Sequence, residues 1–249
     1  MPDLAGQTVL ITGAGAGIGR ALAIGFVKSG AHLVALGRSV GGLEETRQLC
    51  TGPGTFESHV VDVRDGTALE RIFRNVVNER RGVDLLLNNA AVYPRETLQE
   101  MSLSSWAEGV AINLNGVAHG CRAAIRAFPP DREAVIFNVG TFAYLGPEPA
   151  STLYCATKAA VAAFTRALAV ELAATKSRLI VNEWVPSPYR TRMSANTGDD
   201  PNLAFERLLL AWRASKQRPG GRTFLNANEV LPPRSLRSRI KSMLSFHRD

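Results

Sequence analysis

Short apolar runs alternate along the chain with longer segments whose apolar positions recur at helical spacing. The runs are continuous rather than alternating, which is typical of parallel strands covered on both faces. They predict strands at residues 7–12, 32–36, 56–63, 84–88, 134–139 and 178–184, with helices at 18–28, 69–77, 106–127 and 153–173. This order indicates an α/β fold: a single-domain, doubly wound parallel sheet of the Rossmann type with helices on both faces.

Length and composition narrow the class of protein. The 249 residues suffice for one large domain, and we expect residues 1–249 to form it, ending in a divergent basic tail from about residue 226. Apolar residues make up 45% and charged residues 20%, which excludes a disordered chain. The chain contains no run of about 18 apolar residues, so no membrane span is predicted. Its first residues also lack the pattern of a secretory signal.

Cysteine and histidine usage indicates the compartment. The three cysteines are odd in number and far apart, at Cys50, Cys121 and Cys155, and the chain has only four histidines. These residues offer no cluster with the spacing of metal ligands, so no metal is expected. Unpaired cysteines without a secretory signal favour a reducing, cytoplasmic location.

The positive charge is concentrated at the end of the chain. The net charge is +7, and residues 234–249 hold five basic residues against one acidic residue, or +4. The near-neutral body predicts no nucleic-acid partner. In the tail, Leu236, Ile240, Met243 and Leu244 recur at helical spacing. We interpret them as an amphipathic helix that packs on its own domain or on a partner subunit, with an anionic ligand or a membrane surface as the alternative.

A glycine-rich turn, TGAGAGIGR, follows the first predicted strand and leads into a helix. Glycines let the backbone approach a pyrophosphate, and the helix N-terminus supplies free N–H groups and the positive end of the helix dipole. The turn therefore predicts a dinucleotide site at Gly13, Gly15, Gly17, Ile18 and Gly19. The alternative is a tight turn that only needs positive φ angles.

The end of the second strand bears on which dinucleotide binds. Sites that prefer NAD usually carry Asp or Glu there for the ribose hydroxyls, whereas an arginine suits the 2′-phosphate of NADP. This chain has Gly37 followed by Arg38, which favours NADP, with NAD as the alternative cofactor. Arg38 could instead be a solvated surface charge. Ala16 weakens the case for NADP slightly, because a basic residue often precedes the second motif glycine in NADP enzymes.

Tyr154 and Lys158 stand four residues apart in a predicted helix, so both side chains lie on one helix face. A free phenol has a pKa of about 10, and a nearby ammonium lowers it by about 1–3 units. A tyrosine with a lowered pKa is suited to proton transfer. Taken alone, this spacing equally describes a surface pair.

The motifs TGAGAGIG, NNAA, INLNG, IFNVGT and YCATK occur in one order along the chain. Together they resemble the short-chain dehydrogenase/reductase family, in its compact single-domain branch, over about residues 7–193. The resemblance implies an NAD(P)-dependent oxidoreductase that transfers a hydride between a nicotinamide and a ketone or secondary alcohol. It implies that Tyr154 is the general acid/base and that Lys158 lowers its pKa and holds the nicotinamide ribose. It also implies that Asn113 maintains a helix kink and a water relay.

Other positions follow from the same resemblance. Thr141 occupies the place of the serine that orients the substrate; it keeps the hydroxyl, but its methyl group takes space. Further cofactor contacts are implied at Asp62 and Val63 beside adenine, at Asn89 and Ala90, and at Pro186 and Thr191. Ser187 replaces a family glycine, which would cost about 1 kcal/mol if that position required a positive φ.

The residues expected near the substrate are mostly apolar or aromatic. They are Tyr93, Phe142, Tyr144, Leu145, Trp184, Tyr189 and a mobile stretch at 196–212 that contains Leu203, Phe205 and Leu208. This lining predicts a small-molecule apolar ketone or alcohol, although several of these side chains could be core. We expect a homodimer or homotetramer. The alternatives are a non-catalytic dinucleotide-binding regulator and a lyase or dehalogenase on the same scaffold.

Overall fold

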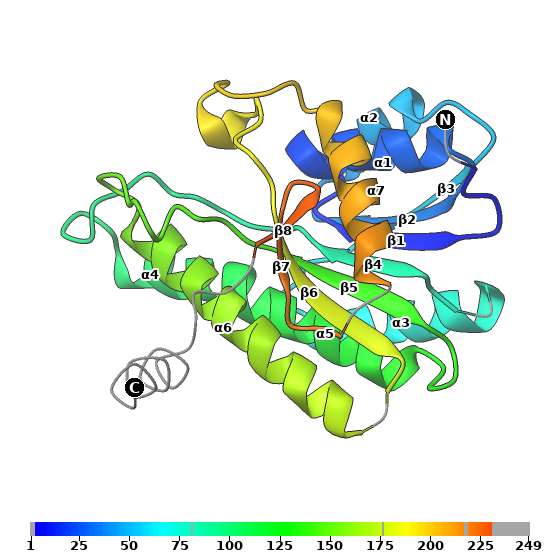
Figure 1. Cartoon of the computed structure of the whole chain (residues 1–249). Helices are drawn as coiled ribbons and strands as arrows, with labels where there is room; N and C mark the ends of the chain where they lie inside the picture. The colour runs from blue at the N-terminus through cyan, green and yellow to red at the C-terminus, as the bar shows by residue number, and fades with distance from the viewer. Residues whose placement is uncertain (1–2, 81, 176, 217–218, 231–249) are drawn as a thin grey trace, which may run out of the picture.

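A computed structural model of the chain describes residues 3–80, 82–175, 177–216 and 219–230. An eight-stranded sheet forms its centre, in the order β3-β2-β1-β4-β5-β6-β7-β8 (Figure 1). The strands are β1 (Thr8–Thr12), β2 (His32–Gly37), β3 (Thr55–Val60), β4 (Leu85–Asn88), β5 (Ala134–Val139), β6 (Leu179–Val185), β7 (Thr223–Leu225) and β8 (Asn228–Val230). Neighbouring strands are parallel except for β7 and β8. The chain starts in the middle of the sheet and builds both halves outward, which confirms the predicted doubly wound fold.

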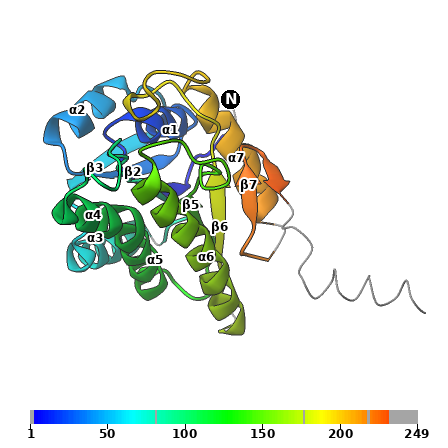
Figure 2. The same ribbon diagram turned by 90° about the vertical axis from the view of Figure 1, so that its left-hand side faces the viewer.

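Helices cover both faces of this sheet (Figures 1 and 2). One face carries α1 (Gly17–Lys28), α2 (Val40–Leu49) and α7 (Leu203–Ser215). The other carries α3 (Gly66–Arg80), α4 (Leu103–Val110), α5 (Gly116–Ala127) and α6 (Thr152–Ala174). A π-helical turn, η1 (Ala111–Asn115), joins α4 to α5, and a short 3₁₀ helix, η2 (Arg192–Ser194), follows β6.

Each face of the sheet has its own apolar core. On the α1 and α7 face, Phe26 packs edge-on against both Phe205 and Trp212. On the α3 and α5 face, Phe73 stacks on Phe128. The central strands β1, β2, β4, β5 and β6 are buried on both sides, which explains why their sequences read as continuous apolar runs.

The structure corrects the prediction for residues 196–212. Most of α7 lies in this stretch, and its Phe205 and Leu208 are core residues rather than substrate-lining ones. Gly25 of α1 makes the packing possible, because a Cβ there would lie 2.3 Å from the Phe205 ring. Trp184 and Tyr189, also predicted to line the substrate pocket, are buried in the same core.

Two further features bear on earlier predictions. Among the described helices, α6 alone has the length and apolar composition of a membrane span, but half of its apolar window is buried in the protein, as in a core helix. At the end of the described chain, β7 and β8 extend the sheet with two short strands that the sequence analysis missed. The amphipathic helix predicted at residues 236–244 lies outside the described residues.

Candidate functional site

A cavity of about 540 Å³ opens at the carboxyl ends of the parallel strands, where the strand order reverses beside β1. Ligands of open α/β sheets bind at such a switch point. The predicted residues that line it are Gly13, Gly15, Gly17, Ile18, Arg38, Asp62, Val63, Asn89, Ala90, Tyr154, Lys158, Pro186 and Thr191. Predicted cofactor and catalytic side chains from six separate segments thus share one cavity.

Gly19 does not line the cavity and instead shapes the turn. A Cβ on Gly19 would lie 2.3 Å from the carbonyl oxygen of Gly13. Gly13 and Gly17 have φ angles of +71° and +54°, which disfavour other residues. A Cβ on Gly13 would also lie 2.9 Å from the Cα of Ala90. The glycines therefore permit both the backbone path and its close approach to the loop after β4.

Hydrogen bonds fix this glycine turn to its neighbours. The Thr12 hydroxyl accepts from the backbone N–H groups of Asn89 (3.0 Å) and Ala90 (3.1 Å), and Asn89 Nδ2 donates to the Thr12 carbonyl at 3.0 Å. On the other side, Arg20 donates to the Gly15 carbonyl at 2.6 Å and forms an ion pair with Glu45 of α2. The turn is held from both sides before any ligand binds.

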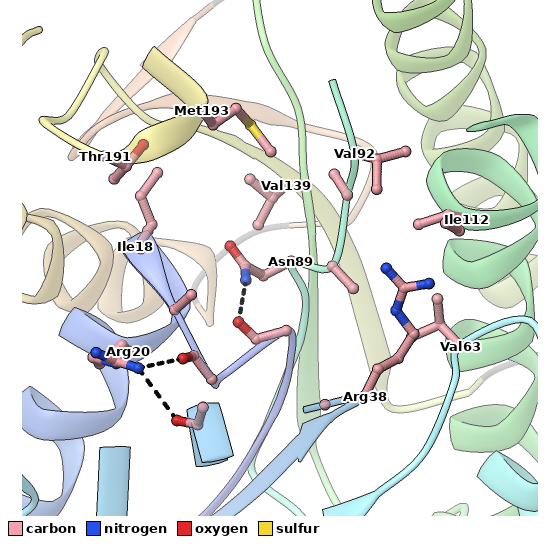
Figure 3. Close-up of a pocket in the computed structure, with 18 of the residues that line it drawn as sticks. Ile18, Arg20, Arg38, Val63, Asn89, Val92, Ile112, Val139, Thr191 and Met193 are labelled. Atoms are coloured by element: carbon pink, nitrogen blue, oxygen red, sulfur yellow. Dashed lines mark hydrogen bonds between the residues drawn. The ribbon is translucent and has the colours of Figure 1, made fainter. Parts of the chain in front are cut away.

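Arg38 extends from the end of β2 toward Val63 and Ile112 (Figure 3). Its guanidinium is half exposed and lies 3.8 Å from carboxylate oxygens of both Asp62 and Glu108. Asp62 is engaged more closely by Arg64, whose Nη2 lies at 2.7 Å and whose hydrogen bond holds the pKa of Asp62 below its usual range. Arg38 therefore has weak partners and can reorient toward an anion.

Tyr154 and Lys158 lie deep in the cavity, at the start of α6. Lys158 is buried, and its Nζ donates to the carbonyl oxygen of Val139 at 2.7 Å. The structure does not place Lys158 as the group that lowers the pKa of Tyr154. Burial raises the pKa of Tyr154 to about 12, and only the neighbouring Thr141 side chain opposes it. The desolvation cost of a buried phenolate outweighs an ammonium 5.8 Å from the ring centroid.

Two stacked side chains, Tyr93 and Arg95, cover Tyr154. The ring of Tyr93 lies parallel to that of Tyr154 with centroids 4.4 Å apart, and the guanidinium of Arg95 lies 4.7 Å above Tyr93. Arg95 also donates to the Met193 carbonyl at 3.2 Å. The loop after β4 and the segment after β6 thereby meet across the mouth of the cavity. Tyr93 is one predicted pocket residue that the structure does bring to Tyr154.

Thr141 and Asn113 stand behind the cavity rather than in its lining. Thr141 lies close enough to Tyr154 to oppose the rise of its pKa, and its hydroxyl accepts from the backbone N–H of Ala143 at 3.1 Å. Asn113 lies in the π-helical turn and is fully buried. Its side chain accepts from the Val92 N–H at 2.8 Å and donates to the Val92 carbonyl at 2.9 Å. The helix is irregular where the resemblance implied a kink.

Ser187 carries none of the strain considered from the sequence, because its φ is not positive. Its backbone N–H donates to Asn226 Oδ1 at 2.9 Å, and its hydroxyl accepts from Asn226 Nδ2 at 2.6 Å. Asn226 itself takes the left-handed conformation, with φ of 53°. The serine thus fastens the end of β6 to the turn between β7 and β8.

Comparison with known proteins agrees with this geometry. The family model described as short chain dehydrogenase matches residues 7–202, more than three quarters of the chain. The chain belongs to the short-chain dehydrogenase/reductase family. A 3β-hydroxysteroid dehydrogenase of Eggerthella lenta is 33% identical over 213 residues, which cover 83% of this chain and 80% of the relative.

Solved structures of this family superpose over most of the chain. A protein from Beutenbergia cavernae described as an NAD(P)-dependent gluconate 5-dehydrogenase, with bound NADP, has a TM-score of 0.77 at 27% identity and covers 91% of this chain and 97% of its own. A 3-ketoacyl-(acyl-carrier-protein) reductase from Brucella melitensis complexed with NADH shares the fold at 23% identity, with a TM-score of 0.79 and coverage of 90% and 97%. The family thus uses NAD(P), and its members include both NADP and NADH complexes.

Several residues of this short-chain dehydrogenase/reductase site were not predicted. They are Ala16, Arg20, Gly37, Ser39, Gly42, Glu45, Val61, Ala91, Val92, Ile112, Val139, Gly140, Arg192 and Met193. Ser39 and Gly42 belong to the start of α2, which the sequence analysis did not identify. Arg192 and Met193 directly follow the predicted Thr191, so the motif around it was the available signal. Ile112 and Val92 could be found only from the packing around Asn113.

Proposed function

We propose that the chain transfers a hydride between NADP(H) and an apolar ketone or secondary alcohol, with Tyr154 as the general acid/base. One observation carries this proposal: Tyr154 and Lys158 line the same cavity as the glycine turn after β1. A dinucleotide held by the turn would extend along the cavity toward Tyr154. A binding module would need the turn, but it would not need a buried tyrosine–lysine pair at the far end.

The residues of the cavity fit a dinucleotide. Helix α1 begins at Gly17 with no side-chain cap and no acidic residue in its first turn, so its free N–H groups suit a pyrophosphate. Arg38 would hold the 2′-phosphate, Asp62 and Val63 the adenine, and Lys158 and Thr191 the nicotinamide half. When bound, the nicotinamide gives or accepts the hydride.

The preference for NADP is supported by the end of β2. Gly37 places no carboxylate where a ribose 2′-hydroxyl would be bound, and the neighbouring Arg38 is half exposed with partners no closer than 3.8 Å. Asp62, one of these two acids, is already paired with Arg64 at 2.7 Å. A doubly charged phosphate would therefore compete well for Arg38.

Residues of the chain itself can supply the proton that carbonyl reduction requires. With its pKa raised to about 12, Tyr154 holds its proton at neutral pH and can donate it to the oxygen of a carbonyl group whose carbon receives a hydride. The Thr141 hydroxyl, close to Tyr154, would orient that oxygen. Lys158, as an ammonium in the same cavity, would offset part of the cost of the tyrosinate that remains, without lowering the pKa of Tyr154 below its ordinary value.

The substrate class follows from the side chains near Tyr154. The Tyr93 ring forms a flat wall against it, and Val92, Val139 and Met193 line the neighbouring cavity. The name of the Eggerthella lenta relative, a steroid dehydrogenase, supports an apolar substrate. The name of the Beutenbergia cavernae protein points to a polar sugar acid, which is the second substrate class to test.

Association and compartment are further proposals. Leu103, Ile125 and Val170 are 90%, 41% and 71% exposed on the neighbouring helices α4, α5 and α6, which supports a homodimer or homotetramer. Free Cys50, Cys121 and Cys155 suit a reducing compartment such as the cytoplasm.

Turnover with a panel of ketones and alcohols, with NADPH and NADH, tests the proposed function. Tyr154→Phe should lower kcat by about 10²–10⁴ and leave the cofactor Kd within a few-fold, because the ring remains and only the proton donor is lost. Tyr189→Phe, which changes a tyrosine of the core, is the matched control. Unchanged turnover in Tyr154→Phe would refute the assignment. Tight NADPH binding without turnover of any substrate by the native chain would favour the regulatory alternative.

A further inference from the structure

The carboxyl group of Glu183 lies close to the candidate site but does not line its cavity. Glu183 is in β6, between Asn182 and Trp184, and is 2% exposed. Its Oε2 accepts a hydrogen bond from the Thr223 hydroxyl of β7 at 2.8 Å. Its Oε1 has no hydrogen-bond partner within the described residues. A buried carboxylate oxygen without a partner is costly, so a compensating interaction is expected.

Lys158 lies near enough to Glu183 for their opposite charges to interact, although the two side chains do not form a direct ion pair. Lys158 Nζ donates to the carbonyl oxygen of Val139. A Cβ on the next residue, Gly140, would lie 2.1 Å from Glu183 Oε1, so the carboxylate occupies the space that this glycine leaves. The ammonium and the carboxylate therefore lie against the same Val139–Gly140 peptide unit.

We propose that Glu183 is a positioning residue whose carboxylate holds Lys158 in its charged form. The inference rests on the proposed role of Lys158 toward the cofactor and Tyr154. Glu183 acts through Lys158, because it does not line the cavity in which the cofactor would bind. Gly140 is part of the arrangement, since any larger residue there would displace the carboxylate.

The electrostatics of both partners agree with this assignment. Burial lowers the pKa of Lys158 to about 8, and Glu183 is the group that opposes this lowering. Burial likewise raises the pKa of Glu183, while the Thr223 hydroxyl, Arg166 and Lys158 lower it. Tyr144, in the loop after β5, also faces this carboxylate. Without the negative charge, Lys158 would lose its proton at a lower pH.

Direct titration of Lys158 tests the proposal independently of turnover. The chain has only five lysines, so the side-chain carbon signals of isotope-labelled lysine can be followed by NMR against pH, with Lys158 assigned from a Lys158→Arg variant. Glu183→Gln keeps the size of the side chain and removes its charge. The midpoint of the Lys158 titration should then fall by about one pH unit or more, as expected for loss of a close opposite charge.

Two other variants make the result specific. Glu171→Gln removes an exposed carboxylate from the same helix as Lys158 and should leave the midpoint unchanged. Glu183→Met also removes the charge, and its side chain needs no hydrogen bond when buried, so the midpoint should fall as in Glu183→Gln; this variant serves if Glu183→Gln does not fold.

The outcomes separate this inference from the proposed function. An unchanged Lys158 midpoint in folded Glu183→Gln, or in Glu183→Met where Glu183→Gln does not fold, would overturn the role of Glu183 and reduce it to a link between β6 and β7. Failure of the native chain to turn over any ketone or alcohol would overturn the proposed function while leaving the titration interpretable.

Discussion

Burial of the Lys158 ammonium should cost the protein stability in a way that depends on pH. The pKa of this lysine is lowered from its ordinary value of 10.5 to about 8, chiefly by desolvation. At about 1.4 kcal/mol per pH unit, the difference corresponds to about 3 kcal/mol. Because the folded pKa lies below the unfolded one, the whole penalty applies below pH 8. It shrinks as the pH rises and disappears above about pH 10.5.

Lys158→Met tests this reasoning, because methionine has a similar shape and no charge. The variant should gain about 3 kcal/mol from the removed charge at pH 7. The hydrogen bond to the Val139 carbonyl is lost at the same time, which costs about 1–3 kcal/mol and can mask the gain. The dependence on pH is the sharper signature, because that second loss does not titrate.

The assay is urea unfolding of the native chain and the variant at pH values from 7 to 10.5. The difference in unfolding free energy should move by about 3 kcal/mol in favour of the native chain over this range, since only the native chain sheds a penalty. Lys28→Met, which removes an exposed lysine at the end of α1, controls for the loss of one charge. A difference that stays constant across the range for Lys158→Met would refute the reasoning.

Substitutions at three further positions test the site. Arg38→Ala should raise the Kd of NADPH at least ten-fold, because a charge-assisted contact of about 1.5–3 kcal/mol is lost, and should leave the Kd of NADH nearly unchanged. Equal losses of affinity for the two cofactors in fluorescence titrations would contradict the assignment. Thr141→Val should lower kcat by about 10²–10³, whereas Thr141→Ser should stay active and accept bulkier ketones; full activity of the valine variant would show that the hydroxyl is not needed. Gly19→Ala should lower the free energy of unfolding in urea by about 1–3 kcal/mol and weaken NADPH binding, because its Cβ would lie 2.3 Å from a backbone oxygen. Gly146→Ala, which has open space around it, is the control and should leave both quantities unchanged.

The central strands of the sheet were predictable because they are buried on both faces. Uninterrupted apolar runs such as that of β5 are required there, and the predicted bounds of β5 agree with the structure. β7 and β8 were missed because three residues are too few to show a periodic pattern. The helix α7 was mistaken for a mobile stretch because its aromatic residues suit a substrate pocket as well as a core. The missing side chain at Gly25, which leaves room for the Phe205 ring, shows that these residues belong to the core and not to a pocket.

The parts of the site that were predictable are those formed by short sequence motifs. The turn and the Tyr154–Lys158 pair are local in sequence, so their spacing located them. The pKa of Tyr154 was wrongly predicted because it depends on burial under Tyr93, from a different segment. Glu183 was overlooked even though an acidic residue in an apolar strand was a visible signal. Its importance comes from its proximity to Gly140, which no linear pattern shows.

The π-helical turn at Ala111–Asn115 determines which side chains of the following helix, α5, face the core. Each residue of an α-helix advances the chain by about 100°, so one extra residue in a turn rotates the next helix relative to the previous one. Here α4 packs on α6, while α5 presents Val117, Cys121 and Ala124 to the core beside α3. Deleting one residue from the turn would swing these three side chains about a quarter of a revolution out of the core. An irregularity of five residues thus keeps two helices facing two different neighbours.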